Sequence, residues 1–149
     1  MAKPVHILNG PNLNLLGTRE VEIYGTETLA DIEQRCQAAA ARLGLTILFA
    51  QTNGEGELVS LVQRAGREAA AVVLNAAAYT HTSLALHDAL KMLGVPLVEI
   101  HLSNVYKREP IRHKSFVSPL ATGVICGFGP FGYELALEAV ARLVAPREP

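Results

Sequence analysis

Glu99 and His101 are the two residues best suited to acid–base chemistry, and they stand two positions apart in the apolar segment 97–102. This segment is typical of a strand, in which alternate side chains point to the same face. The two side chains can therefore hydrogen-bond, and a carboxylate beside an imidazole orients the ring and favours its protonated form. We interpret His101 as a general acid supported by Glu99. His6 and His87 lack such an acidic partner, so we expect structural roles for both.

Tyr24 is the candidate general base. It precedes Gly25 in a predicted loop, and Arg19 lies five positions before it. A nearby cation favours the phenolate, which is the form of tyrosine that accepts a proton. A tyrosine in a loop is more often a packing or surface residue, so this spacing alone does not establish the role. Tyr106 and Tyr133 keep that structural interpretation.

Further polar side chains follow the predicted strands. A single asparagine or serine at such a place is typical of a turn. Ligands of parallel sheets bind at the carboxyl ends of the strands, however, and these residues would converge there. The set consists of Asn9, Asn12, Asn14, Asn75, Tyr79, His81, Ser103 and Asn104.

Two other segments have a possible binding role. The basic run 106–114 can bind an anion or can be a solvated loop, and the absence of interleaved aromatic residues disfavours nucleic acid. Gly127, Gly129 and Gly132 fit the spacing of a dinucleotide-binding turn. Pro130 removes a backbone donor there, and no strand follows to provide the expected acidic residue. We interpret these glycines as turn and close-packing residues.

The hydrophobic pattern predicts the elements that must position these side chains. Strands are expected at 5–8, 45–50, 71–74, 97–102 and 123–126. Helices are expected from the Thr28 cap to Gly44, at 57–68, from the Ser83 cap to Leu93 and at 133–144. A long loop is expected between the first strand and Gly25. This alternation predicts an α/β fold, a flavodoxin-like parallel sheet of five strands in the order 2-1-3-4-5 with helices on both faces.

Length and composition fit a single domain spanning residues 1–149. Half of the residues are apolar, and the formal net charge of −1 gives no general reason to expect nucleic acid or a membrane as partner. The two cysteines, Cys36 and Cys126, have no metal-binding spacing and form no disulfide framework. Neither a signal peptide nor a membrane span is recognisable. We therefore expect a cytoplasmic protein.

Several segments together resemble the type II dehydroquinases, and they cover nearly the whole chain. The resemblance implies reversible dehydration of 3-dehydroquinate to 3-dehydroshikimate through an enolate, in the shikimate pathway or in quinate breakdown, with no metal or organic cofactor. The matching segments are Asn9–Glu20, Tyr24–Gly25, Asn53 with Glu55–Glu57, Ala78–Ser83, Glu99–Asn104, Arg108–Glu109, Arg112–His113, Gly127–Gly129 and Gly132–Tyr133.

The resemblance also implies catalytic roles. Tyr24 would remove a proton beside the ketone, with Arg19 holding it as phenolate. Asn12 would place a water that stabilises the enolate oxygen. His101, supported by Glu99, would protonate the departing hydroxyl.

Binding roles follow from the same resemblance. Asn75, Ser103 and the backbone near Leu102 would hold the substrate carboxylate, and His81 and Arg112 would bind ring hydroxyls. The segment 19–24 would close as a lid. Arg108 would belong to this lid by its electrostatic support of the base. Asp88 would face a neighbouring subunit's site, which implies trimers assembled into a dodecamer.

The chain departs from the family pattern at positions that affect backbone shape near the site. Val21 replaces a common proline, Gly54 replaces a frequent histidine, and Ala76-Ala77 replaces a usual Pro-Gly. None of these changes removes a proposed acid, base or ligand.

Three alternatives remain open from the residues. A lysine–imine route is disfavoured because none of the lysines lies in a strand or directly at its end. A non-catalytic flavodoxin-like module would bind a nucleotide or flavin at the strand ends. An interaction domain would use the segment 108–114 for an acidic partner and would bind with strong salt dependence.

Overall fold

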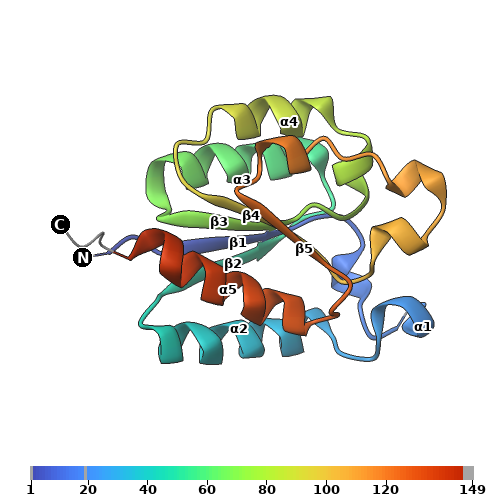
Figure 1. The fold of residues 1–149 in the computed structure, drawn as a ribbon, viewed down its shortest axis with the longest axis horizontal. Helices are drawn as coiled ribbons and strands as arrows, with labels where there is room; N and C mark the ends of the chain where they lie inside the picture. Colours follow the sequence, from blue (N-terminus) through green and yellow to red (C-terminus); the bar gives the residue numbers. More distant parts are fainter. Residues whose placement is uncertain (1, 19, 146–149) are drawn as a thin grey trace.

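The computed structural model describes residues 2–18 and 20–145, and these form a parallel sheet with helices on both faces (Figure 1). The strands lie in the order β2-β1-β3-β4-β5, and every neighbouring pair is parallel. This is the predicted flavodoxin-like order. The strands are β1 (Val5–Asn9), β2 (Ile47–Gln51), β3 (Ala71–Asn75), β4 (Leu97–His101) and β5 (Gly123–Cys126).

Four helices form the two outer layers. α2 (Leu29–Leu43) and α5 (Phe131–Val144) pack together on one face, and α3 (Glu55–Glu68) and α4 (Leu84–Lys91) on the other (Figure 1). α2 begins with the predicted capping box, since Thr28 and Asp31 each accept a hydrogen bond from the other's backbone. The predicted Ser83 cap of α4 is also present, through the backbone amide of Leu86.

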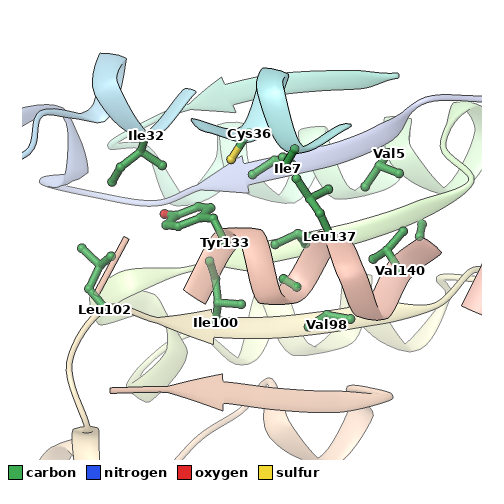
Figure 2. Close-up of a cluster of buried hydrophobic side chains, with 14 of the residues drawn as sticks. Val5, Ile7, Ile32, Cys36, Val98, Ile100, Leu102, Tyr133, Leu137 and Val140 are labelled. Carbon is green, nitrogen blue, oxygen red and sulfur yellow. The ribbon is translucent and has the colours of Figure 1, made fainter. Parts of the chain in front are cut away.

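The core lies on both sides of the sheet because the three central strands, β1, β3 and β4, are buried along their whole length. Figure 2 shows the larger cluster, in which Tyr133 and Leu137 of α5 face Ile7 of β1 and Ile100 of β4. Strands buried on both faces explain the continuous apolar runs of the sequence.

The segments that follow β1 and β4 differ from the expectation of plain loops. The segment before Gly25 contains a 3₁₀ turn, Leu13–Leu15, and the one-turn helix α1, Val21–Tyr24. The segment after β4 contains three further 3₁₀ turns, Val105–Lys107, Pro110–Arg112 and Ser118–Leu120. Elements of three or four residues are too short to show a helical hydrophobic period, and α1 has no buried residue. The pattern therefore could not reveal them.

A close backbone approach fixes the first site loop against the third strand. The amide of Gly10 donates to the carbonyl of Asn75 at 2.8 Å. A Cβ atom on Gly10 would lie 2.4 Å from the carbonyl oxygen of Ala76, closer than any side chain tolerates. Glycine at this position thus lets the chain leaving β1 lie beside the end of β3.

Candidate active site

A pocket opens at the carboxyl ends of the central strands, where the sequence predicted a site. It brings together nine of the predicted residues, which come from the segments after β1, β3 and β4. Its lining consists of Pro11, Asn12, Leu13, Leu16, Tyr24, Asn75, Ala77, Ala78, His81, His101, Leu102, Ser103, Val105, Arg108 and Arg112. The apolar members of this wall, such as Leu13 and Val105, were not predicted, because their types do not distinguish a pocket wall from core.

Glu99 lies behind His101 and holds its ring. Nε2 of His101 and Oε2 of Glu99 are 2.5 Å apart, and the two side chains are 8% and 1% exposed. Because Nε2 faces the carboxylate, Nδ1 is the ring nitrogen that remains for a ligand in the pocket. The predicted pairing of these two residues is present.

Two serines hold the carboxylate of Glu99 from the other side. The hydroxyl of Ser118 donates to Oε1, and the hydroxyl of Ser115 donates to Oε2 at 3.3 Å. Ser115 in turn accepts from the amides of Val117 and Ser118. These contacts satisfy an otherwise costly buried charge. The sequence carried no signal for them, since serine is common in turns.

His81 lies beside His101, with ring centroids 6.2 Å apart and planes inclined by 20°. Its Nδ1 lies 2.7 Å from the carbonyl oxygen of Lys114, which can only accept, so Nδ1 carries the hydrogen. Burial lowers the pKa of His81, and the hydrogen bond to Lys114 opposes this only in part. The ring is therefore neutral near pH 7, and its Nε2 is a hydrogen-bond acceptor.

The hydroxyl of Tyr24 accepts a hydrogen bond from Nη1 of Arg108 at 2.8 Å. The guanidinium carbon also lies 5.4 Å from the centre of the Tyr24 ring, and the same Nη1 is 3.5 Å from Oγ of Ser103. The described structure thus places a charged donor on the oxygen of the candidate base. The other predicted cation, Arg19, lies outside the described residues.

Asn75 is held by two neighbours at the floor of the pocket. Its Nδ2 donates to the hydroxyl of Tyr133 at 3.0 Å, and its Oδ1 accepts from the amide of Ala77 at 3.2 Å. Tyr133 donates in turn to Oδ1 of Asn9 at 2.6 Å. Tyr133 was interpreted as a packing residue, and it is fully buried, but its hydroxyl also contacts Asn75, which lines the pocket.

The remaining predicted residues have separate supports. Asn12 has a left-handed φ of 68°, and its amide donates to Oδ1 of Asn53 at 3.0 Å. Nε of Arg112 is 2.5 Å from Oε1 of Glu109. The carbonyl of Leu102 accepts from the amide of Gly129 at 2.9 Å. Arg112 and Asn12 both line the pocket, so a basic side chain and an amide side chain are within it.

The glycines after β5 fit the predicted turn. Gly127 and Gly129 have positive φ angles of 97° and 59°. A Cβ atom on Gly127 would lie 3.2 Å from Cβ of Asn104, so the turn packs closely on the segment after β4.

Among the described residues to which the family resemblance gave a role, Glu99, behind His101, and Asp88 are outside the lining of this pocket. Asp88 is exposed on α4 and absent from the lining.

No helix formed by residues 2–18 or 20–145 is long and apolar enough to cross a membrane. Within the same residues, no three His, Cys, Asp or Glu side chains are grouped to hold a metal ion.

The pocket thus combines a tyrosine oxygen beside a cation, a histidine fixed by a buried carboxylate, and amide, hydroxyl and guanidinium donors. One group can accept a proton and another can donate one, while the donors can hold an anion. This set suits elimination of water from a small anionic hydroxyketone.

Comparison with known proteins gives a consistent result. The family described as "Dehydroquinase class II" matches residues 3–141. The 3-dehydroquinate dehydratase of Hyphomonas neptunium is 61% identical over 143 residues, covering 96% of each chain. The type II dehydroquinase structure from Propionibacterium acnes has a TM-score of 0.91 at 43% identity, covering 95% of this chain and 98% of that one. The chain belongs to the class II dehydroquinase family.

Proposed function

We propose that the pocket dehydrates 3-dehydroquinate to 3-dehydroshikimate, so that the chain is a hydro-lyase, 3-dehydroquinate dehydratase. One observation carries the proposal: Tyr24 and His101 line the same pocket. Tyr24 is hydrogen-bonded to Arg108, and His101 is hydrogen-bonded to Glu99. Family membership and the activity for which the most similar relatives are named agree with it. The reaction serves the shikimate pathway or quinate breakdown.

The reaction runs in two steps. Tyr24, as phenolate, takes a proton from the carbon beside the ketone, and the electron pair moves to the ketone oxygen as an enolate. A water placed by Asn12 stabilises that oxygen. The enolate then re-forms the ketone and expels the hydroxyl one carbon further on, while Nδ1 of His101 protonates it. One water leaves and a conjugated double bond remains. Solvent then takes the gained proton from Tyr24 and returns a proton to His101, which restores both groups.

Arg108 stabilises the phenolate in this scheme, and its hydrogen bond to the Tyr24 hydroxyl supports this role. Arg19 provides a second positive charge on the segment 19–24, which closes over bound substrate. Glu99 fixes the His101 ring so that Nδ1 meets the leaving hydroxyl. No cofactor takes part.

The substrate is held by the polar groups around the pocket. Nδ2 of Asn75, the hydroxyl of Ser103 and the backbone at Leu102 bind the carboxylate. Nε2 of neutral His81 accepts from one ring hydroxyl, and Arg112 donates to another. The lining positions of these residues support this arrangement.

The assembly and location are further parts of the proposal. Asp88 is exposed on α4 and stands outside its own chain's pocket, which is consistent with a contact in a neighbouring subunit's site. We infer trimers gathered into a dodecamer in the cytoplasm, with a small-molecule substrate and neither nucleic acid nor a membrane as partner.

Ultraviolet absorbance of the purified protein with 3-dehydroquinate tests the reaction, because the conjugated enone absorbs as water leaves. We expect rapid growth of absorbance in wild type and in Tyr106→Phe, at a residue that is 62% exposed, and almost none in Tyr24→Phe. Absence of growth in every variant would reject the enzyme and favour a binding module. Inactivation by borohydride in the presence of substrate would instead indicate a lysine–imine route.

A further inference from the structure

Tyr133 joins the ends of two neighbouring strands through one hydroxyl group. Asn9 and Asn75 are register partners at the ends of β1 and β3. The hydroxyl of Tyr133 donates to Oδ1 of Asn9 at 2.6 Å and accepts from Nδ2 of Asn75 at 3.0 Å. Figure 2 shows the ring among the apolar side chains of the core, from which its oxygen projects.

The hydrogen bonds from Ala50 through Asn9 and Tyr133 to Asn75 form a series. The direction of each bond in the series is determined by the one before it. The carbonyl of Ala50 can only accept, and Nδ2 of Asn9 donates to it at 3.0 Å. Oδ1 of Asn9 must therefore face Tyr133, whose single hydroxyl hydrogen goes to it. The hydroxyl oxygen then has only lone pairs to offer, so Asn75 must present Nδ2 to it.

The same order determines what Asn75 can offer to a ligand. Its Oδ1 accepts from the amide of Ala77, so the acceptor end is occupied. Among the hydrogen bonds of the described residues, Nδ2 has one acceptor, Tyr133, and an amide nitrogen carries two hydrogens. The second hydrogen remains for a group in the pocket, which Asn75 lines.

We propose that Tyr133 is a positioning residue that fixes Asn75 as a hydrogen-bond donor toward the substrate carboxylate. Tyr133 does not line the pocket and acts only through Asn75. Burial raises the pKa of Tyr133 well above its usual range, so the hydroxyl keeps the hydrogen that sets the direction of the series. The inference rests on the proposed function for the identity of the ligand.

Removal of the hydroxyl would release this constraint. In Tyr133→Phe, Nδ2 of Asn75 loses its partner, and the 3.2 Å hydrogen bond from the amide of Ala77 is the remaining described contact that opposes turning of the Asn75 oxygen toward the pocket. An amide oxygen repels a carboxylate, whereas an N–H group binds it. The loss should therefore appear mainly in substrate binding, and the groups that transfer protons, Tyr24 and His101, keep their own partners.

The experiment is a double-mutant cycle on steady-state kinetics with 3-dehydroquinate. We expect Tyr133→Phe to raise KM by roughly 10-fold, with kcat changed less than about 3-fold, as for a lost hydrogen bond to a charged group. Asn75→Ala should raise KM at least as much, and the double variant should be no worse than Asn75→Ala. Tyr106→Phe is the matched control.

The inference would be overturned if the KM increases of Tyr133→Phe and Asn75→Ala multiplied in the double variant. An unchanged KM in Tyr133→Phe would also overturn it. Asn9→Ala provides the same test by a second route, because it removes the acceptor for the Tyr133 hydrogen. It should raise KM only where Asn75 is present, and an equal rise in the Asn75→Ala background would also overturn it.

Calorimetric binding of 3-dehydroquinate, measured in a Tyr24→Phe background, separates this inference from the proposed function. If the wild-type protein shows no turnover of 3-dehydroquinate, the proposed reaction is rejected. The same titration still reports whether Tyr133→Phe weakens binding of the carboxylate, and equal affinity with and without the hydroxyl would reject the role of Tyr133.

Discussion

Nη1 of Arg108 lies 2.8 Å from the hydroxyl oxygen of Tyr24, although the two residues are 84 positions apart. The side chain of Arg108 is only 14% exposed, so this charge is little screened by solvent. The contact joins the segment after β4 to the segment after β1 at the point where the candidate base must ionise.

Arg108→Gln tests the importance of that charge. The amide keeps a hydrogen-bond donor but removes the cation, so less phenolate should be present and kcat should fall by roughly 10²-fold. Lys107→Gln is the control, since Lys107 lies on the same turn but outside the lining of the pocket. Equal activity of Arg108→Gln and wild type in steady-state assays would contradict the proposed support of Tyr24.

Ser118→Ala tests the support of Glu99. The carboxylate would lose a donor while remaining buried, which costs about 1–3 kcal/mol of folding free energy. We also expect kcat to fall by roughly 10-fold, because Glu99 holds the ring of His101. Denaturant unfolding and kinetics measure the two effects, and a loss of stability with full activity would show that the serine is only structural.

Ala77→Gly should stabilise the protein. Ala77 has a φ of 52°, a left-handed conformation that costs a residue with a Cβ atom about 1 kcal/mol, and the family pattern often has glycine there. We expect the free energy of unfolding to rise by about 0.5–1 kcal/mol in urea titrations. Ala76→Gly, at a φ of −76°, is the control and should be destabilising.

His6 should make stability depend on pH. It is buried on β1, and burial, followed by the charge of Arg64, lowers its pKa. The unfolded state therefore binds more protons than the folded state below about pH 6.5, and stability is lost as pH falls below that value. We expect His6→Leu to flatten the fall in unfolding free energy as the pH decreases below about 6.5. Parallel slopes for the two proteins would contradict this.

Local rules of the sequence predicted much of the fold. The capping box of Thr28 and Asp31 and the apolar runs of the central strands need only neighbouring residues, and so does the placement of Glu99 and His101 on one face of β4. These features follow from the periods of a helix and a strand.

Contacts between distant segments could not be predicted in the same way. The hydrogen bond from Asn75 to Tyr133 joins residues 58 positions apart and depends on how α5 is rotated over the sheet. The contact of Ser118 with Glu99 depends on a 3₁₀ turn too short to show a period. Tyr133 and the two serines near Glu99 were consequently missed as parts of the site.

The most direct test of the account compares turnover with binding in Tyr24→Phe, which keeps the ring and removes only the oxygen that accepts the proton. Steady-state kinetics give kcat, and calorimetry gives the Kd of 3-dehydroquinate. The account predicts a fall in kcat of roughly 10³-fold or more with Kd changed less than about 3-fold, because Tyr24 acts mainly in the transition state. Turnover within about 10-fold of wild type, or losses of equal size in turnover and binding, would contradict Tyr24 as the base.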